Sequence, residues 1–250
     1  RALAISYAKA SSMGQLSGLN LANVSANPAT ELDFQVANTM AAMANDVEYT
    51  FINGAYKDGT YDDVAYKTKG IIAAITTNAT AASSAPLGFW LVAEAIEGIS
   101  SHNAPTDSLV LMTNPVHIMQ INADASSNGM TIVPASRNIN GLAIDTLITP
   151  FGSIGLLANP YVAAGNAVIV NPTVCAPVYL DVPGKGNFFL EPLAKTGAAD
   201  KYQIYGQVGL DFGAENYHAK ITGLATTFTA PTYHQSVYVA GGTVQTTSGT

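Results

Sequence analysis

The stretch PATELDFQVANTMAAMANDVEYTFIN, residues 28–53, decides the first element of the fold. Asn27 is placed to cap a helix, and Pro28 takes the first helical position, where a missing N–H leaves no hydrogen bond unmade. Apolar residues then recur every three or four positions as one stripe: Leu32, Val36, Met40, Met43, Val47 and Phe51. This spacing predicts an amphipathic helix, roughly 39 Å long at about 1.5 Å per residue, that ends before Gly54. We expect the stripe to lie in a core.

The residues around this helix favour shorter elements. Arg1 to Ala26 is rich in Ser, Ala, Asn and Gly, which predicts an extended arm or loop that orders only against a neighbour. After the helix, the expected elements are a strand over Gly70–Thr77, a linker over Thr80–Ser84, a helix over Leu87–Ser100, a strand over Ser108–Thr113 and a short helix over Pro115–Ala123.

From Met130 onward, short apolar runs alternate with Pro, Gly and Asn, a pattern typical of strands. The expected strands are Thr131–Val133, Ile144–Thr149, Ala167–Val170, Cys175–Leu180 and Phe188–Leu190, and the Thr-, Gly- and Ser-rich end of the chain contains an alternating segment over Ser236–Val239. Tyr202–Asp211 and Tyr217–Leu224, separated by Gly213 to Asn216, predict a final antiparallel pair.

Charge is scarce in this chain. Only 11% of its 250 residues are charged, whereas an ordinary soluble domain carries about 25%. Something other than bulk water should therefore cover much of the surface. The net charge of -7 and the scattered basic residues argue against tight binding to nucleic acid, because that affinity comes chiefly from Lys and Arg on phosphates.

The long uncharged stretch Thr146–Leu180 does not predict a transmembrane helix, since Pro150, Pro160, Pro172 and Pro177 interrupt it. No targeting signal is visible, and the start at Arg1 rather than methionine suggests that a leading segment was removed or left out. Cys175, the single cysteine, is expected to be a buried, inert thiol.

One set of motifs matches the order used by penicillin-recognising serine enzymes: Ser6-x-x-Lys9, Ser126-x-Asn128 and Lys195-Thr196-Gly197. It would supply a nucleophile, a base and an oxyanion-side lysine. The serine must open a buried helix packed on a sheet, yet five residues precede Ser6 and Ser11, Ser12 and Gly14 follow closely. Such short patterns also arise easily by chance in a chain rich in Ser and Asn. We expect no catalytic site.

Other polar groups also favour ordinary roles. His102, His117, His218 and His234 lack the spacing of a metal motif, and Asp58, Asp62 and Asp63 lack the glycine and glutamate offsets of a calcium loop. Gly184-Lys185-Gly186 is expected to be a hairpin tip, not a phosphate cradle. The aromatics Tyr49, Phe51, Tyr56, Tyr61 and Tyr66 have few basic neighbours, which favours packing or subunit contact over base stacking. No cofactor, metal or catalytic residue is expected.

Three motifs, taken in their order along the chain, resemble those of tailed-bacteriophage major capsid proteins of the HK97-fold family. Asn45 to Gly54 is similar to the family's acidic pair, apolar pair and glycine at the end of its long helix, and Lys67-Thr68-Lys69-Gly70-Ile71-Ile72 resembles the basic and glycine step that follows. Pro192-Leu193-Ala194-Lys195-Thr196-Gly197 looks like the turn before the last strand pair in siphophage-type capsids. The resemblance covers most of Arg1 to about Leu224.

The resemblance implies an α+β, HK97-type capsid fold with a long spine helix. Its expected parts are an N-terminal arm or end of an extended loop over 1–27, a peripheral domain over 28–86 with the spine helix at 28–53, an axial domain over 87–190, return strands of the peripheral domain over 191–225, and a C-terminal extension over 226–250.

The function implied is a structural major capsid protein that self-assembles into hexamers and pentamers of an icosahedral head around phage DNA. Portal, scaffold and cement proteins are the further partners implied, with DNA bound only non-specifically and no membrane. The protein would assemble in the host cytoplasm and reside in the virion. The alternative class is a secreted serine hydrolase or surface-binding module, for which low charge and abundant Thr, Asn and Ala are also unsurprising.

Overall fold

The computed structural model describes residues 1–10, 31–59, 66–128, 132–139, 142–195, 197–229, 234–238 and 244–248. These residues fall into two compact units, each built from two separate stretches of chain. Unit 1 comprises Arg1–Ala73 and Ala176–Asp211, and unit 2 comprises Ala74–Cys175 and Phe212–Thr250. The fold class is α+β, as expected.

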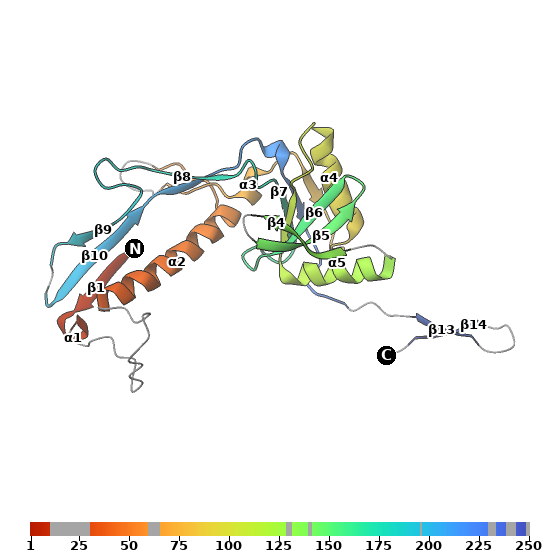
Figure 1. Ribbon diagram of the computed structural model, residues 1–250, viewed down its shortest axis with the longest axis horizontal. Coiled ribbons are helices and arrows are strands. Elements are labelled where there is room, and N and C mark those ends of the chain that lie inside the picture. Colours follow the sequence, from red (N-terminus) through yellow and green to blue (C-terminus); the bar gives the residue numbers. More distant parts are fainter. Residues whose placement is uncertain are drawn as a thin grey trace. The chain divides into compact units, whose positions relative to one another are not determined.

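Unit 1 combines one long helix with small antiparallel sheets (Figure 1). Its three-stranded sheet has the order β1-β10-β9, and β11 pairs with β8 in a two-stranded sheet. The elements are β1 (Ala2–Ser6), α1 (Tyr7–Ala10), α2 (Glu31–Asn53), β8 (Ala176–Tyr179), β9 (Phe188–Leu193), β10 (Ala199–Gly206) and β11 (Val208–Asp211). Helix α2 contacts β1 and β11, which places the long helix against both sheets.

Two glycines explain how α2 ends. The Gly54 N–H donates to Thr50 O at 2.8 Å, and the Gly70 N–H donates to Gly54 O at 2.8 Å. A Cβ on Gly54 would lie 2.5 Å from both Thr50 O and Thr68 O, closer than real Cβ contacts allow. The returning chain therefore crosses the helix end at a distance that only glycine permits. The predicted helix end at Asn53 is confirmed, and residues 28–30 lie outside the described part.

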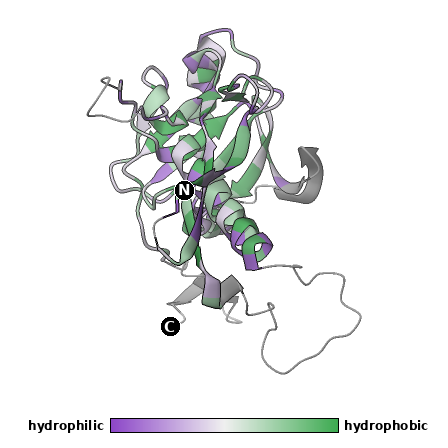
Figure 2. Cartoon of the chain, turned by 90° about the vertical axis from the view of Figure 1, so that its left-hand side faces the viewer, coloured by the Kyte–Doolittle hydropathy of each residue, from purple (hydrophilic) through white to green (hydrophobic). Residues whose placement is uncertain are grey.

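The apolar stripe on α2 is not the core expected from its spacing. Only Ile52 of this helix is buried, and the side chain of Met40 is 44% exposed. The other stripe residues are half-buried. Unit 1 places only small sheets beside α2, so its own described residues leave part of the stripe uncovered. Figure 2 shows apolar and polar colours interspersed along this helix.

Unit 2 is built on a seven-stranded mixed sheet with the order β2-β12-β7-β3-β6-β5-β4. The strands are β2 (Ala79–Ala81), β3 (Val110–Thr113), β4 (Ile132–Ile139), β5 (Leu142–Thr149), β6 (Gly152–Ala158), β7 (Asn166–Val170) and β12 (Ala219–Thr222). The pairs β3–β6 and β12–β2 are parallel, and the others are antiparallel. The helices α4 (Phe89–Ser101) and α5 (Pro115–Asn128) pack against it.

A closed hydrophobic core holds unit 2 together. Its central strands contribute Leu111, Ile169 and Ile221, all fully buried, and α4 adds Val92, Ile96 and Ile99. The runs VLMT in β3 and NAVIV in β7 read as continuous apolar segments because central strands of this sheet are covered on both faces. These apolar runs therefore supply the central strands of the core.

Many predicted elements are present, with shifted ends. These are α4, α5, β3, β4, β5, β7, β8 and β9, and α5 extends five residues beyond the expected Ala123. The strand β6 was not predicted, because Gly152, Ser153 and Gly155 obscure its apolar alternation. The prediction of a strand over Gly70–Thr77 is wrong: Ile71–Ala74 is the short helix α3, and the next strand, β2, lies in the expected linker.

The first residues of the chain are not the arm expected from their composition. Ala2–Ser6 form β1, with Ala2 opposite Gln203 and Ser6 opposite Ala199 on β10. Leu3 and Ile5 alternate with small residues, and Ile5 is buried, which is the period-two pattern of a half-covered strand. Residues 11–26 of the expected arm lie outside the described part.

The expected final antiparallel pair is also wrong. β12 does not pair with β10 or β11 but lies between β7 and β2 in unit 2. The 3-10 helix η1 (Glu215–Tyr217) and Gly213, with φ +61°, turn the chain between these strands. Ala219 and Ile221 are fully buried in the large sheet, whereas a two-stranded pair could not cover them. Burial therefore overrides pairing with the sequence neighbour.

The difference between the two units predicts the effect of truncating apolar side chains. Leu111→Ala should lower the unfolding free energy of dissociated subunits by about 2–5 kcal/mol, because it leaves a cavity in a closed core. Met40→Ala is the matched control and should change it by at most about 0.5 kcal/mol. Urea unfolding measures both, and equal losses would mean that α2 is covered within the subunit.

Candidate functional site

The structure does not place Ser6 where the possible serine-enzyme motif requires its nucleophile. Ser6 is the exposed last residue of β1, not the first residue of a buried helix, and the four-residue α1 follows it. Ser126 and Asn128 belong to α5 in unit 2, whereas Ser6 and Lys195 belong to unit 1. Thr196 lies outside the described residues. Within the described residues, Ser6 therefore does not open the buried helix that this motif requires.

Lys195 is held in its charged form. Its Nζ lies 2.6 Å from Asp200 Oδ1 and 5.7 Å from the centre of the Tyr7 ring. Hydrogen bonds with Asp200 and Tyr7, together with their charges, raise the pKa of Lys195 above its ordinary value. A catalytic lysine base needs the opposite shift, so this group is suited to tying α1 to β10.

The two buried histidines are fully engaged in the fold, as expected. His117 Nε2 accepts from the Gly165 N–H at 3.1 Å, and its Nδ1–H donates to Gln120 Oε1 at 2.9 Å. His218 Nδ1 accepts from the Asn171 N–H at 3.2 Å, and its Nε2–H donates to Phe212 O at 2.7 Å. Burial lowers the pKa of His218 below its ordinary value, which keeps this ring neutral.

The other metal and ligand candidates give no site in the described part. His102 is exposed at the end of α4, and the side chain of His234 lies outside that part. Among the residues whose side chains are described, no three His, Cys, Asp or Glu groups gather to hold a metal. Cys175 is half-buried, so the expected buried thiol is only partly covered.

The Gly184-Lys185-Gly186 segment is a turn, as expected. Val182 and Gly186 form an antiparallel bridge, and both glycines have positive φ. Lys185 Nζ lies 2.6 Å from Glu191 Oε1 and 5.0 Å from the Phe189 ring centre. The single cation of this turn is thus paired with a carboxylate of β9. The turn also leads into that strand and not into a helix, so no helix N-terminus follows it to bind a phosphate.

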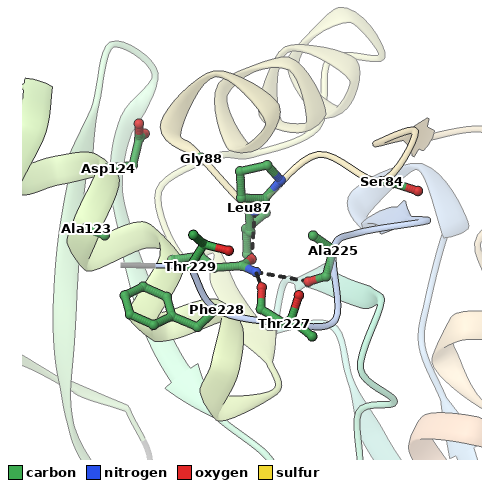
Figure 3. Close-up of a pocket in the computed structure, with 11 residues that line it drawn as sticks. Ser84, Leu87, Gly88, Ala123, Asp124, Ala225, Thr227, Phe228 and Thr229 are labelled. Atoms are coloured by element: carbon green, nitrogen blue, oxygen red, sulfur yellow. Dashed lines mark hydrogen bonds between the residues drawn. The ribbon is translucent and has the colours of Figure 1, made fainter. Parts of the chain in front are cut away.

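Gln120 organises the polar centre of unit 2, and Figure 3 labels its hydrogen-bond partners Leu87, Ala225 and Thr227. Its Oε1 accepts from the Leu87 N–H at 2.8 Å as well as from His117, and its Nε2 donates to Ala225 O at 2.9 Å and Thr227 O at 3.0 Å. All four hydrogen bonds of the amide are therefore made. The hollow beside it, about 390 Å³, is lined by Gly88, Asp124 and Phe228 among others. Asp124 Oδ2 accepts from the Phe89 N–H at 2.8 Å and so caps α4.

Glu215 fastens the start of unit 2 to the segment before β12. Its Oε2 accepts from the Thr76 N–H at 2.6 Å and the Thr76 hydroxyl at 2.7 Å, and its Oε1 accepts from the Thr77 hydroxyl at 2.6 Å. These hydrogen bonds, with the Thr77 hydroxyl contributing most, lower the pKa of Glu215 to about 2. Asn78 extends the contact by donating to Asn216 O and His218 O, both at 3.0 Å. This carboxylate acts as a structural clamp.

The most distinctive surface is the apolar surface of unit 1. Its buried apolar side chains within the described residues are Ile5, Ile52, Ile71 and Ile204. Its exposed ones are far more numerous: Tyr7, Phe34, Met40, Tyr49, Tyr56, Tyr66, Val178, Tyr179, Leu180, Phe188, Leu190 and Leu193. We call this second set the open apolar surface. Exposed apolar side chains that gather into a patch mark association sites, and five of this set, Tyr56, Tyr66, Val178, Tyr179 and Leu180, line one groove.

A groove forms part of the open apolar surface. Its volume is about 800 Å³, and its lining includes Tyr56, Tyr66, Tyr179 and Leu180. Tyr56 is 64% exposed and Tyr66 is 72% exposed. Two of the tyrosines near the helix end, which we expected to serve in packing or subunit contact, therefore line one exposed groove. Tyr61 lies outside the described part.

Comparison with known families decides what this arrangement belongs to. The sequence model described as SU10 major capsid protein matches residues 10–225. The chain belongs to the SU10 major capsid protein family. Its role is therefore structural, in a capsid shell. The curated proteins compared with the chain yield no match.

Solved structures establish the HK97-type capsid fold for this family member. The SrpI encapsulin of Synechococcus elongatus aligns with a TM-score of 0.67 at 12% identity, covering 94% of this chain and 76% of that one. A putative capsid protein of an E. coli prophage aligns at 0.56 and 8% identity, covering 89% and 76%. The capsid of cyanophage A-1(L) aligns at 0.55 and 11% identity, covering 90% and 76%. The resemblance found in the sequence is confirmed.

No helix in the described part of the capsid chain is both long and apolar enough to cross a bilayer. The spine helix α2 carries Asp33, Asp46 and Glu48 on its exposed side, and of its apolar residues only Ile52 is buried. The exposed apolar side chains of unit 1 agree with the low charge of the chain.

Glu215 gives a pH-dependent prediction. Because its folded pKa is about 2 and its ordinary value is 4.5, its contribution to stability is present above pH 4.5 and is lost as the pH falls toward 2. Glu215→Gln should lower the unfolding free energy by about 1–2 kcal/mol at pH 7, a figure reduced for partial exposure, and should flatten the pH dependence of the melting temperature between pH 4.5 and 2.

Glu191→Gln is the matched control, since Glu191 forms only an exposed ion pair with Lys185. It should cost at most about 0.5 kcal/mol. Calorimetry of dissociated subunits across this pH range measures both variants. Equal behaviour of the two would contradict the clamp.

Proposed function

We propose that this chain self-assembles into hexamers and pentamers that form the icosahedral head of a tailed phage around its DNA. The observation that carries the proposal is the open apolar surface of unit 1, which has too few buried side chains to close a core of its own. Neighbouring copies provide the missing cover. Closing a ring and then a shell makes later contacts effectively intramolecular, so contacts that are weak in pairs become stable together.

Within this assembly we assign unit 1 to the peripheral domain and unit 2 to the axial domain. The boundaries implied by the sequence, 28–86 and 191–225 for the peripheral part and 87–190 for the axial part, differ from the two compact units at residues 74–86, 176–190 and 212–225. The spine helix α2 and the three-stranded sheet support the first assignment, and the seven-stranded sheet with its closed core supports the second.

We further propose that this protein has no catalytic activity and binds no cofactor. Asp200 and Tyr7 stabilise the charged form of Lys195, and both ring nitrogens of each buried histidine form hydrogen bonds within the fold. The net charge of -7 supports only non-specific contact with packaged DNA. Portal, scaffold and cement proteins are the further partners proposed, with assembly in the host cytoplasm before residence in the virion.

The open apolar surface can be tested with one substitution. Tyr66→Glu should abolish or strongly reduce shells in electron microscopy and light scattering, because it places a charge where a neighbour must exclude water. Dissociated subunits should unfold as the unchanged chain does, since Tyr66 is 72% exposed. Tyr66→Phe is the matched control and should assemble normally. Normal shells from Tyr66→Glu would remove the groove from the proposed contacts.

The absence of serine-enzyme chemistry can be tested by intact-mass spectrometry after incubation with a penicillin. We expect no stoichiometric adduct, because Ser6 is the exposed last residue of β1 and does not open a buried helix. A single acyl adduct that disappears in Ser6→Ala would instead support the hydrolase alternative.

A further inference from the structure

The C-terminal segment forms an element of its own. Residues 226–250 lie beyond the match to the capsid family, which ends at residue 225. Within them, β13 (His234–Tyr238) and β14 (Val244–Ser248) form an antiparallel hairpin, with His234 opposite Ser248 and Tyr238 opposite Val244. In the described part of the chain, these two strands pair only with each other. Each therefore presents one outer edge of main-chain N–H and C=O groups.

The sequence of this hairpin does not protect those edges. Natural sheets protect exposed edges with charges, prolines, bulges or short strands. Unit 2 does so: β4 contains Pro134, Arg137 and a register shift, and β2 is three residues long. In contrast, residues 226–250 contain no Lys, Arg, Asp or Glu, and Pro231 precedes both strands. A two-stranded hairpin alone is only marginally stable in water, so this composition suits an edge that becomes covered.

The start of the segment is firmly attached to unit 2. The Leu224 N–H donates to Gly165 O at 2.9 Å, the Ala225 N–H donates to Ala85 O at 3.0 Å, and Gln120 Nε2 holds Ala225 O and Thr227 O. Figure 3 shows Ala225 and Thr227 at this attachment, beside Leu87. The chain from Thr227 to His234 can span at most about 25 Å. The hairpin thus stays within a limited distance of its own subunit.

We propose that the β13–β14 hairpin pairs edge to edge with a strand of a second copy of this chain. The inference rests on the proposed function, because a shell holds copies side by side at a high effective concentration. Main-chain pairing provides the contact, and the uncharged strands offer nothing that would select a charged partner. The extension thereby acts as a tie between neighbouring subunits.

Hydrogen exchange of the full chain tests the pairing directly. In dissociated subunits, only the amides that face the other strand of the hairpin should be protected. In assembled particles, outward-facing amides of residues 234–238 or 244–248 should exchange at least about tenfold more slowly, together with the amides of the strand that they join. Equal exchange of this segment in particles and subunits would overturn the inference.

A second experiment compares two variants. One lacks residues 230–250, and the other replaces them with 21 residues of Gly and Ser; both keep the carbonyls that Gln120 binds. Each variant's subunits should melt like the full chain, whereas each variant's particles should dissociate at lower denaturant concentration. If the Gly–Ser particles match those of the full chain, the tie is refuted. Failure of the full chain to form any particle would instead contradict the proposed function, and this inference with it.

Discussion

The uneven burial of apolar side chains is the constraint on which the rest of this protein depends. Unit 2 closes its core, because the central strands of its seven-stranded sheet are covered and α4 adds five buried aliphatic residues. Unit 1 is also rich in apolar residues but has only small sheets and one long helix to cover them. Since exposed apolar area favours association, the exposed side chains of unit 1 favour contacts with other subunits.

Several polar side chains of unit 2 hold distant backbone segments together through hydrogen bonds. Gln120, Glu215 and His218 each join segments that are distant in the sequence, and their hydrogen-bonding groups are engaged in doing so. A buried group that has its partners stabilises one arrangement, because breaking that arrangement leaves a desolvated donor or acceptor. The same residues that could suggest a catalytic or metal site in a sequence are thus used in the fold.

The crossing at Gly54 and Gly70 links the family resemblance to a physical cause. The motif at the end of the spine helix and the step at Lys67 to Gly70 are separate in the sequence, but the structure joins them through the Gly70 N–H bond to Gly54 O. Any side chain at Gly54 would meet two carbonyl oxygens at 2.5 Å.

The sequence by itself determined the elements whose signals are local. The spacing on α2, its end before Gly54, the apolar runs of β3 and β7, and the order of motifs typical of capsids are all readable without coordinates, and they led to the correct fold family. Low charge indicated that the surface would be covered, although it did not identify the residues. Only the tertiary structure decided which apolar residues remain open, that β1 completes a sheet with β10, and that β12 lies between β7 and β2. Burial and long-range pairing depend on what the rest of the chain brings alongside, and a local pattern holds no information about that neighbour.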